Sequence, residues 1–310
     1  MSLTPDGAPL RFSLLMIGLA AANLMAQVRT ADATKRGWQE SDFPRTIQVS
    51  PNVYTYEDFH AGADRFTTTN MFVVTSEGVL VADAQGDRKA TGGLIDAIRK
   101  VTPQPIRYVV VCSEHPDHTG GNAAFPAGVT WIAHPATKAA IHLPDNTVLV
   151  PDAKTVTMGG EEFRIEFIGR GHTAGPLIVY LPRQKIAFLS ETFCNHLFPQ
   201  LRTGYPSEWI ATLDRAEKID AKVFIPGHGF TERGDVSREE LHAFREEVAA
   251  VVAEVTRLYK AGVPVEEAVK QANWGPYVTW TGGGSPSPRI QDMGPVAVRR
   301  VYLELSGKLD

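Results

Sequence analysis

The chain has 310 residues, of which 43% are hydrophobic, and a formal net charge of -4 at pH 7. This composition suits one large domain or two small ones, and it gives no general reason to expect binding to nucleic acid or stable insertion into a membrane. Only two cysteines occur, Cys112 and Cys194, so the chain is not a disulfide scaffold. Composition leaves open whether the two cysteines pair, and it says nothing of the oligomeric state.

Residues 1–33 resemble a secretory signal peptide. Arg11 precedes an apolar run over residues 12–26 that is too short to span a bilayer comfortably, and residues 31–33 (ADA) offer a small-x-small cleavage site. The alternatives are a mispredicted start and an ordinary amphipathic arm. The signal predicts a periplasmic or secreted protein, in which residues 34–45 form a linker into the domain.

From residue 46 the chain alternates short β-branched or apolar strands with amphipathic helices. The expected strands are 47–49, 53–56, 71–74, 79–83, 106–111, 129–133, 155–158, 162–167, 176–181, 185–190 and 223–225. The expected helices are 89–100, 135–142 and 207–219. Periodicity alone therefore predicts a mixed α/β domain over residues 34–235.

Residues 236–310 differ in character and are predicted to be a helical extension of the same domain. Helices are expected at 237–260, 264–271 and 297–305, separated by a segment rich in glycine, proline, serine and aromatic residues. The extension is expected to complete the core. The alternative is that Trp274, Tyr277 or Trp280 lines a substrate site.

Three motifs with histidines follow three of the predicted strands. They are SEHPDHTGGN (113–122), GHTAG (171–175) and PGHG (226–229). Imidazole nitrogens and carboxylate oxygens are ligands that suit zinc and similar ions in hydrolytic sites. A short turn carrying His115, Asp117 and His118 can serve two neighbouring metal positions, because alternate side chains point in different directions.

In this order and at these separations, the motifs resemble those of the metallo-β-lactamase superfamily, over about residues 46–235. The resemblance implies an αββα sandwich, a site for one or two zinc ions, and a small-molecule substrate. It also implies hydrolysis in which metal-bound hydroxide attacks an acyl group of a β-lactam, lactone or thioester. The superfamily acts on many other substrates, so the motifs say little about which one is used here.

The resemblance assigns six metal ligands by position in the motifs: His115, Asp117, His118, His172, Glu191 and His228. The first metal position would keep His115 and His172, and the second would keep Asp117, His118 and His228. Asp117 would also orient the nucleophile and accept its proton.

Two residues depart from the family pattern. Ser113 stands where the usual motif has its first histidine, and Glu191 replaces the usual bridging aspartate. Three interpretations follow. The protein could hold one zinc, in the second position, or it could be an inactive relative. It could also hold two metals, because Glu191 is longer than aspartate and because Ser113, a water or another residue fills the gap. Glu114, Cys194 and His196 are the nearby residues that could be recruited.

Two residues are candidates to anchor ligands without binding metal, namely Asp83 and Thr173, although plain structural roles suit them equally. His60, His134 and His142 lie outside the motifs and are not expected to be ligands. The alternative function is a metal-binding protein without hydrolytic turnover. A di-iron oxidoreductase is disfavoured, because the first histidine is missing and no flavodoxin-like domain follows.

Two observations point to different substrates. Export would place the protein where β-lactams act, which favours a β-lactamase-like activity. The stretch 115–126 instead resembles periplasmic relatives linked to quinoprotein or sulfur metabolism.

Overall fold

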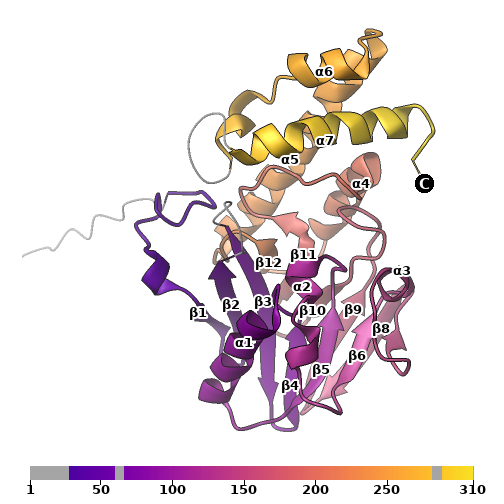
Figure 1. Cartoon of the computed structure of the whole chain (residues 1–310). Coiled ribbons are helices and arrows are strands. Elements are labelled where there is room, and N and C mark those ends of the chain that lie inside the picture. The colour runs from indigo at the N-terminus through magenta and orange to yellow at the C-terminus, as the bar shows by residue number, and fades with distance from the viewer. Residues whose placement is uncertain (1–27, 60–65, 281–287, 310) are drawn as a thin grey trace, which may run out of the picture.

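The computed structural model describes residues 28–59, 66–280 and 288–309 (Figure 1). Twelve strands in this part of the chain form one sheet, in the order β7-β6-β5-β4-β3-β12-β11-β10-β9-β8, with β2 also pairing with β3 and β1 with β2. The first half of the sheet comprises β1 (Arg45–Ser50), β2 (Val53–Phe59), β3 (Thr67–Thr75), β4 (Gly78–Ala82), β5 (Ile106–Val111), β6 (Thr130–Ala133) and β7 (Val148–Leu149). The second half comprises β8 (Ala153–Met158), β9 (Glu161–Glu166), β10 (Ile178–Leu181), β11 (Ile186–Cys194) and β12 (Val223–His228).

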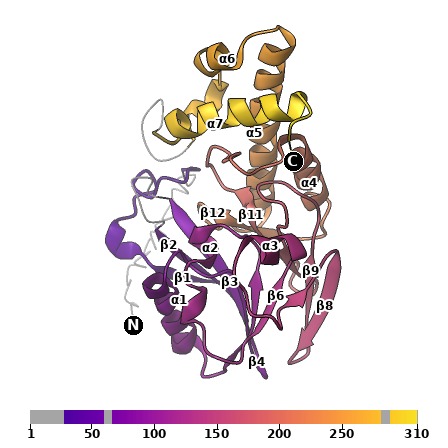
Figure 2. The ribbon, with the colours of Figure 1, turned by 45° about the vertical axis from the view of Figure 1, so that its right-hand side comes forward.

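The helices are α1 (Arg88–Val101), α2 (Pro116–Thr119), α3 (Pro135–Ala140), α4 (Pro206–Ala216), α5 (Asp235–Lys260), α6 (Val265–Gln271) and α7 (Pro288–Leu305). Helix α1 lies on the outer face of the first half and helices α4 and α5 on that of the second, while α6 and α7 pack on α5. Three short 3-10 helices complete the described elements: Glu40–Asp42, Asn122–Ala124 and Gly275–Thr279. Figure 2 shows α6 and α7 above the strand ends, away from α1.

Three layers of apolar packing make this a sandwich. Between the two halves of the sheet, Met71 of β3 belongs to one buried cluster with Phe163 of β9 and Phe188 of β11. The apolar face of α1 packs on the outside of the first half, as the buried Leu94 illustrates. Helices α4 and α5 cover the outside of the second half, where Trp209 and Phe244 lie in one cluster with β11. The predicted αββα architecture is confirmed.

Two helices differ from the prediction. Helix α7 begins at Pro288, nine residues before the expected start, and runs through Pro295. The buried Ala297, Val298 and Val301 share a cluster with α5, so tertiary packing outweighs the helix-breaking tendency of Gly294 and Pro295. The four-residue helix α2, which carries Asp117 and His118, lies in a segment expected to be a turn.

The last six residues of the predicted signal lie within the described structure and pack against the domain. Ala31 is 2% exposed and belongs to the same buried cluster as α5. Nearby, Nη2 of Arg29 lies 2.6 Å from Oε2 of Glu239. The signal peptide stays a prediction, and this packing favours a cleavage point nearer the N-terminus than Ala33. Its apolar run over residues 12–26 lies outside the described residues, as does His60.

Within the described residues, no helix combines the length and apolar character needed to cross a membrane.

Candidate metal centre

The six predicted ligands come together at one end of the sandwich, where the strands end. His115 precedes α2, Asp117 and His118 lie in α2, and His172 lies in the loop between β9 and β10. Glu191 is in β11, and His228 is the last residue of β12. Their ligand atoms form two groups that share Glu191, each with all atoms within 4.8 Å of one another. The grouping follows the predicted division into two positions.

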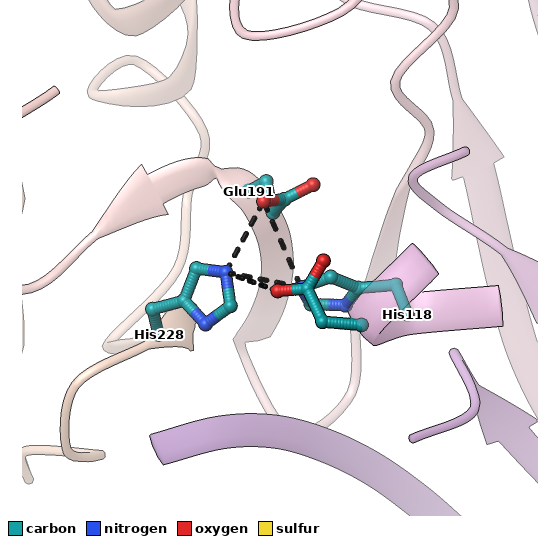
Figure 3. A group of neighbouring side chains, drawn as sticks. His118, Glu191 and His228 are labelled. Atoms are coloured by element: carbon teal, nitrogen blue, oxygen red, sulfur yellow. Dashed lines mark hydrogen bonds and ion pairs between the residues drawn. The ribbon is translucent and has the colours of Figure 1, made fainter. Parts of the chain in front are cut away.

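The second group contains Asp117, His118, Glu191 and His228. Figure 3 shows the side chains of His118, Glu191 and His228 pointing towards one another. Nε2 of His228 lies 3.3 Å from Nε2 of His118, 3.2 Å from Oδ2 of Asp117 and 3.1 Å from Oε1 of Glu191. Three of the four side chains are almost fully buried, and Asp117 is the most exposed, at 17%.

The first group contains His115, His172 and Glu191. Nδ1 of His115 lies 2.9 Å from Nε2 of His172 and 3.0 Å from Oε2 of Glu191, while Oε1 of Glu191 lies 2.9 Å from Nε2 of His172. The hydroxyl of Ser113 donates a hydrogen bond to Oε2 of Glu191. Ser113 therefore contacts this group through the carboxylate, in the place where the family pattern has an imidazole.

Three of the histidines are oriented by contacts of their outer ring nitrogens. Nδ1 of His118 lies 3.0 Å from Oδ2 of Asp83, and Nδ1 of His228 lies 3.0 Å from the carbonyl oxygen of Thr67. Nε2 of His115 lies 3.1 Å from Oγ1 of Thr203. Because carboxylates and carbonyls only accept, His118 and His228 donate these bonds and keep Nε2 for an ion.

Asp83 occupies a strained position that serves the site. Its φ of 63° is in the left-handed region, where non-glycine residues are rare. Besides His118, its carboxylate accepts from the backbone N–H of Cys112 at 2.7 Å and from the hydroxyl of Ser190 at 2.5 Å. The anchoring contact predicted for Asp83 is present. The Thr173 hydroxyl is buried and bonds to no histidine among the described residues.

Glu191 reaches the site because β11 is irregular beside it. Ser190 has a φ of 47°, and the pairing of β11 with β12 shifts register on both sides of Ser190. A Cβ on Gly227 of β12 would lie 2.5 Å from the carbonyl carbon of Ser190 and 2.7 Å from the backbone nitrogen of Glu191. Only glycine allows the two strands to approach this closely at the carboxylate.

Glu191 and the histidines around it shift one another's pKa values. Burial alone would raise the pKa of Glu191, but the nearby His115, His172 and His118 outweigh it and hold that pKa well below its usual value. Burial would lower the pKa of His115, yet Glu191 raises it to about 9. In His228, hydrogen bonds to Asp117 and Glu191 likewise overcome burial and raise the pKa to about 9.

The donor set fits a metal ion. In both groups two imidazole nitrogens face each other, at 2.9 Å and 3.3 Å, so that without an ion one of each pair must hold a proton. A divalent cation would satisfy both lone pairs and the carboxylates at once. Mixed imidazole and carboxylate ligands suit zinc.

The other candidate ligands lie elsewhere. Nε2 of His196 lies 2.5 Å from Oε2 of the buried Glu240 in α5, and the His196 ring packs against that of Trp280 at an angle of 46°. His196 belongs to neither group of candidate ligands. The Sγ of Cys194 contacts the backbone carbonyl of Glu191 at 3.7 Å. Both Cys112 and Cys194 are buried thiols, and no disulfide joins these two described residues. Glu114 belongs to neither group.

Three residues of this site were not predicted: the Thr67 carbonyl, Ser190 and Thr203. The backbone carbonyl leaves no trace in a sequence motif. Thr203 lies 88 positions from His115 in an ordinary loop segment, so only the folded chain brings them together.

Comparison with known proteins agrees with the fold. A model of the Metallo-beta-lactamase superfamily matches residues 64–228, and the chain belongs to this family. Metallo-beta-lactamase IND-1 from Chryseobacterium indologenes is 25% identical over 200 residues, which cover 61% of this chain and 84% of the relative. Hydroxyacylglutathione hydrolase from Brucella anthropi is 28% identical over 224 residues, which cover 67% and 82%.

Two solved structures show the same fold. A metallo-beta-lactamase from Pontibacter korlensis superimposes with a TM-score of 0.59 at 23% identity, covering 65% of this chain and 98% of its own. The inverting sec-alkylsulfatase Pisa1 from Pseudomonas sp. gives a TM-score of 0.65 at 16% identity, covering 88% of this chain and 52% of its own. Family membership makes this chain a member of a superfamily of metal-dependent hydrolases, and the identities are too low to transfer a substrate.

Proposed function

We propose that this protein is a zinc-dependent hydrolase that acts on an acyl bond of a small molecule, such as a β-lactam, lactone or thioester. The observation that carries the proposal is the position of Glu191, whose single carboxylate lies within 3.1 Å of histidines from both groups. The named relatives include β-lactamases and a hydroxyacylglutathione hydrolase, so they support the reaction class more than any one substrate.

Asp117 is the residue best placed to handle a proton. When bound, zinc would lower the pKa of a coordinated water to about 7 and polarise the substrate's carbonyl. Asp117 is the most exposed member of the second group and lines a cavity of about 210 Å³ together with Phe59, Thr68 and Gln85. Its carboxylate can therefore orient an attacking water and accept its proton, while the cavity takes part of a small substrate.

The two positions are unequal in their ligands. The second position has three protein ligands of its own, Asp117, His118 and His228, which would leave a fourth place for water, as in catalytic zinc sites. The first has only His115 and His172 of its own, and both positions share Glu191. The bond from Ser113 further occupies one oxygen of that carboxylate. We infer one tightly held zinc in the second position and a weaker one in the first.

Metal content and chelation test the proposal together. Full-length protein prepared without chelator is assayed for zinc per chain and for hydrolysis of a chromogenic cephalosporin, a thioester and a lactone. We expect about one tightly bound zinc and hydrolysis that a chelator abolishes and zinc restores. Hydrolysis that survives complete removal of metal would overturn the proposal. Bound zinc without turnover of any substrate would favour the alternative of a metal-binding protein.

Export to the periplasm or medium is part of the proposal. The apolar run preceded by Arg11 supports it. N-terminal sequencing of the exported protein would locate the cleavage point, which the packing of Ala31 leads us to expect before Ala31.

A further inference from the structure

A chain of contacts connects His115 of the first group to the C-terminal helices through Thr203. Nε2 of His115 lies 3.1 Å from Oγ1 of Thr203, and the Thr203 hydroxyl donates to the backbone carbonyl of His172 at 3.4 Å. Since the only hydroxyl proton is used in that second bond, Oγ1 accepts the Nε2–H of His115. Nδ1 of His115, which faces His172 and Glu191, then keeps its lone pair for an ion.

Thr203 itself lies on an exposed loop, and helix α7 holds that loop in place. Nε of Arg300 donates to the carbonyl of Gly204 at 2.6 Å, and Nη2 donates to the carbonyl of Thr203 at 3.3 Å. One turn further along α7, Oε2 of Glu304 accepts from the hydroxyl of Ser207 at 2.8 Å.

The other side of the loop is fixed to the loop that carries His172. The backbone N–H of Tyr205 donates to the carbonyl of Gly171 at 2.7 Å. The segment 203–207 is thus held between the His172 loop and α7. This differs from His118 and His228, whose outer nitrogens contact Asp83 at the end of β4 and a carbonyl within β3, both in the sheet.

We propose that Thr203 and Arg300 are positioning residues for the first metal position: Thr203 orients the ring of His115, and Arg300 fixes the loop that presents Thr203. The proposal rests on the proposed metal-dependent function. It gives the C-terminal extension a role at the site, in addition to completing the core.

Zinc affinity of four variants tests the proposal. Thr203→Val removes the hydroxyl at nearly constant volume, and Thr203→Ser keeps it. Arg300→Gln removes the guanidinium, while Arg299→Gln is its matched control, because Arg299 is exposed and pairs with Glu266 of α6 at 2.7 Å. Zinc binding to the metal-free full-length chain is measured by competition with a chromophoric chelator, and thermal unfolding is recorded in parallel.

We expect Thr203→Val to weaken the weaker zinc by about tenfold or more, with the tighter zinc unchanged. Thr203→Ser should restore binding, and Arg300→Gln should weaken it where Arg299→Gln does not. Unaltered affinity of Thr203→Val for every zinc would overturn the inference, as would equal losses in Thr203→Val and Thr203→Ser. A wild-type chain that binds no zinc would instead overturn the proposed function.

Discussion

At Ser113 a neutral hydroxyl stands where the family pattern has an imidazole, and the structure shows what this hydroxyl does. It is 1% exposed and donates to Oε2 of Glu191, the same oxygen that lies 3.0 Å from Nδ1 of His115. The hydroxyl thereby competes with an ion for a carboxylate that both groups share. This bond and the missing nitrogen both support the proposed weakness of the first position.

Replacing the hydroxyl by an imidazole should rebuild the first position. Ser113→His supplies a neutral nitrogen donor and frees Oε2 of Glu191, so we expect about two zinc ions per chain where the wild type holds about one tightly. Elemental analysis after exhaustive dialysis measures this. Ser113→Ala is the matched control, because it frees the carboxylate without adding a ligand. Unchanged zinc content in Ser113→His would show that Ser113 does not limit the first position.

The clustering of the candidate ligands was predictable from the sequence, and the orientation of their side chains was not. His115, His172 and His228 follow strands with strong apolar patterns, so the motifs alone place them at one end of the sheet. The hydroxyl of Thr203 reaches His115 only because α7 braces an irregular loop. Such contacts depend on tertiary packing between segments far apart in the chain, and no local pattern encodes them.

At the scale of elements, the limits of strands were predictable from the local sequence, whereas the ends of helices depended on tertiary packing. Strand β5 has the predicted limits because its β-branched run is bounded by a proline and a polar segment. Helix α7 was predicted to begin at residue 297 because Gly294 and Pro295 oppose helix formation locally. Their cost is offset by burial against α5, which a one-dimensional pattern does not show.

Helix α3 contains a pH-sensitive cap. Nδ1 of His134 accepts the backbone N–H of Ala136 at 3.1 Å, and burial lowers the pKa of His134 despite the carbonyl of Pro151 and the charge of Asp152. The unfolded chain therefore takes up this proton more readily than the folded one. The stability that neutral His134 contributes is complete above its unfolded pKa of about 6.5 and is lost as the pH falls below that value.

Replacing His134 should flatten this pH dependence. His134→Asn keeps a side-chain acceptor for the cap and removes the titration. Thermal unfolding at pH 7 and pH 5 should show a smaller loss of Tm in the variant than in the wild type. His142→Asn, at an exposed histidine, serves as the control and should follow the wild type. An identical loss in His134→Asn and the wild type would contradict the assignment.

At the scale of the whole molecule, the helical extension and the sandwich share one apolar cluster. Buried residues of α5 and α7 belong to it together with residues of β11 and α4. The N-terminal arm joins the same cluster through Ala31. A chain that shares one core in this way is expected to unfold as one unit, which would make residues 236–310 part of the same domain.

Substitution of Phe244 in α5 tests whether the extension and the sandwich unfold as one unit. It is fully buried, and its ring centroid lies 5.9 Å from that of Phe193 in β11 and 5.6 Å from that of Trp209 in α4. Phe244→Ala should cost about 3–5 kcal/mol and lower Tm by on the order of 10 °C. Calorimetry should show the whole transition moving as one peak, while Leu303→Ala, at a 40% exposed position of α7, should barely shift it. Two peaks, of which only one moves, would mean that the extension is a separate domain and that its contacts with the sandwich, Arg300 included, form an interface between two folding units.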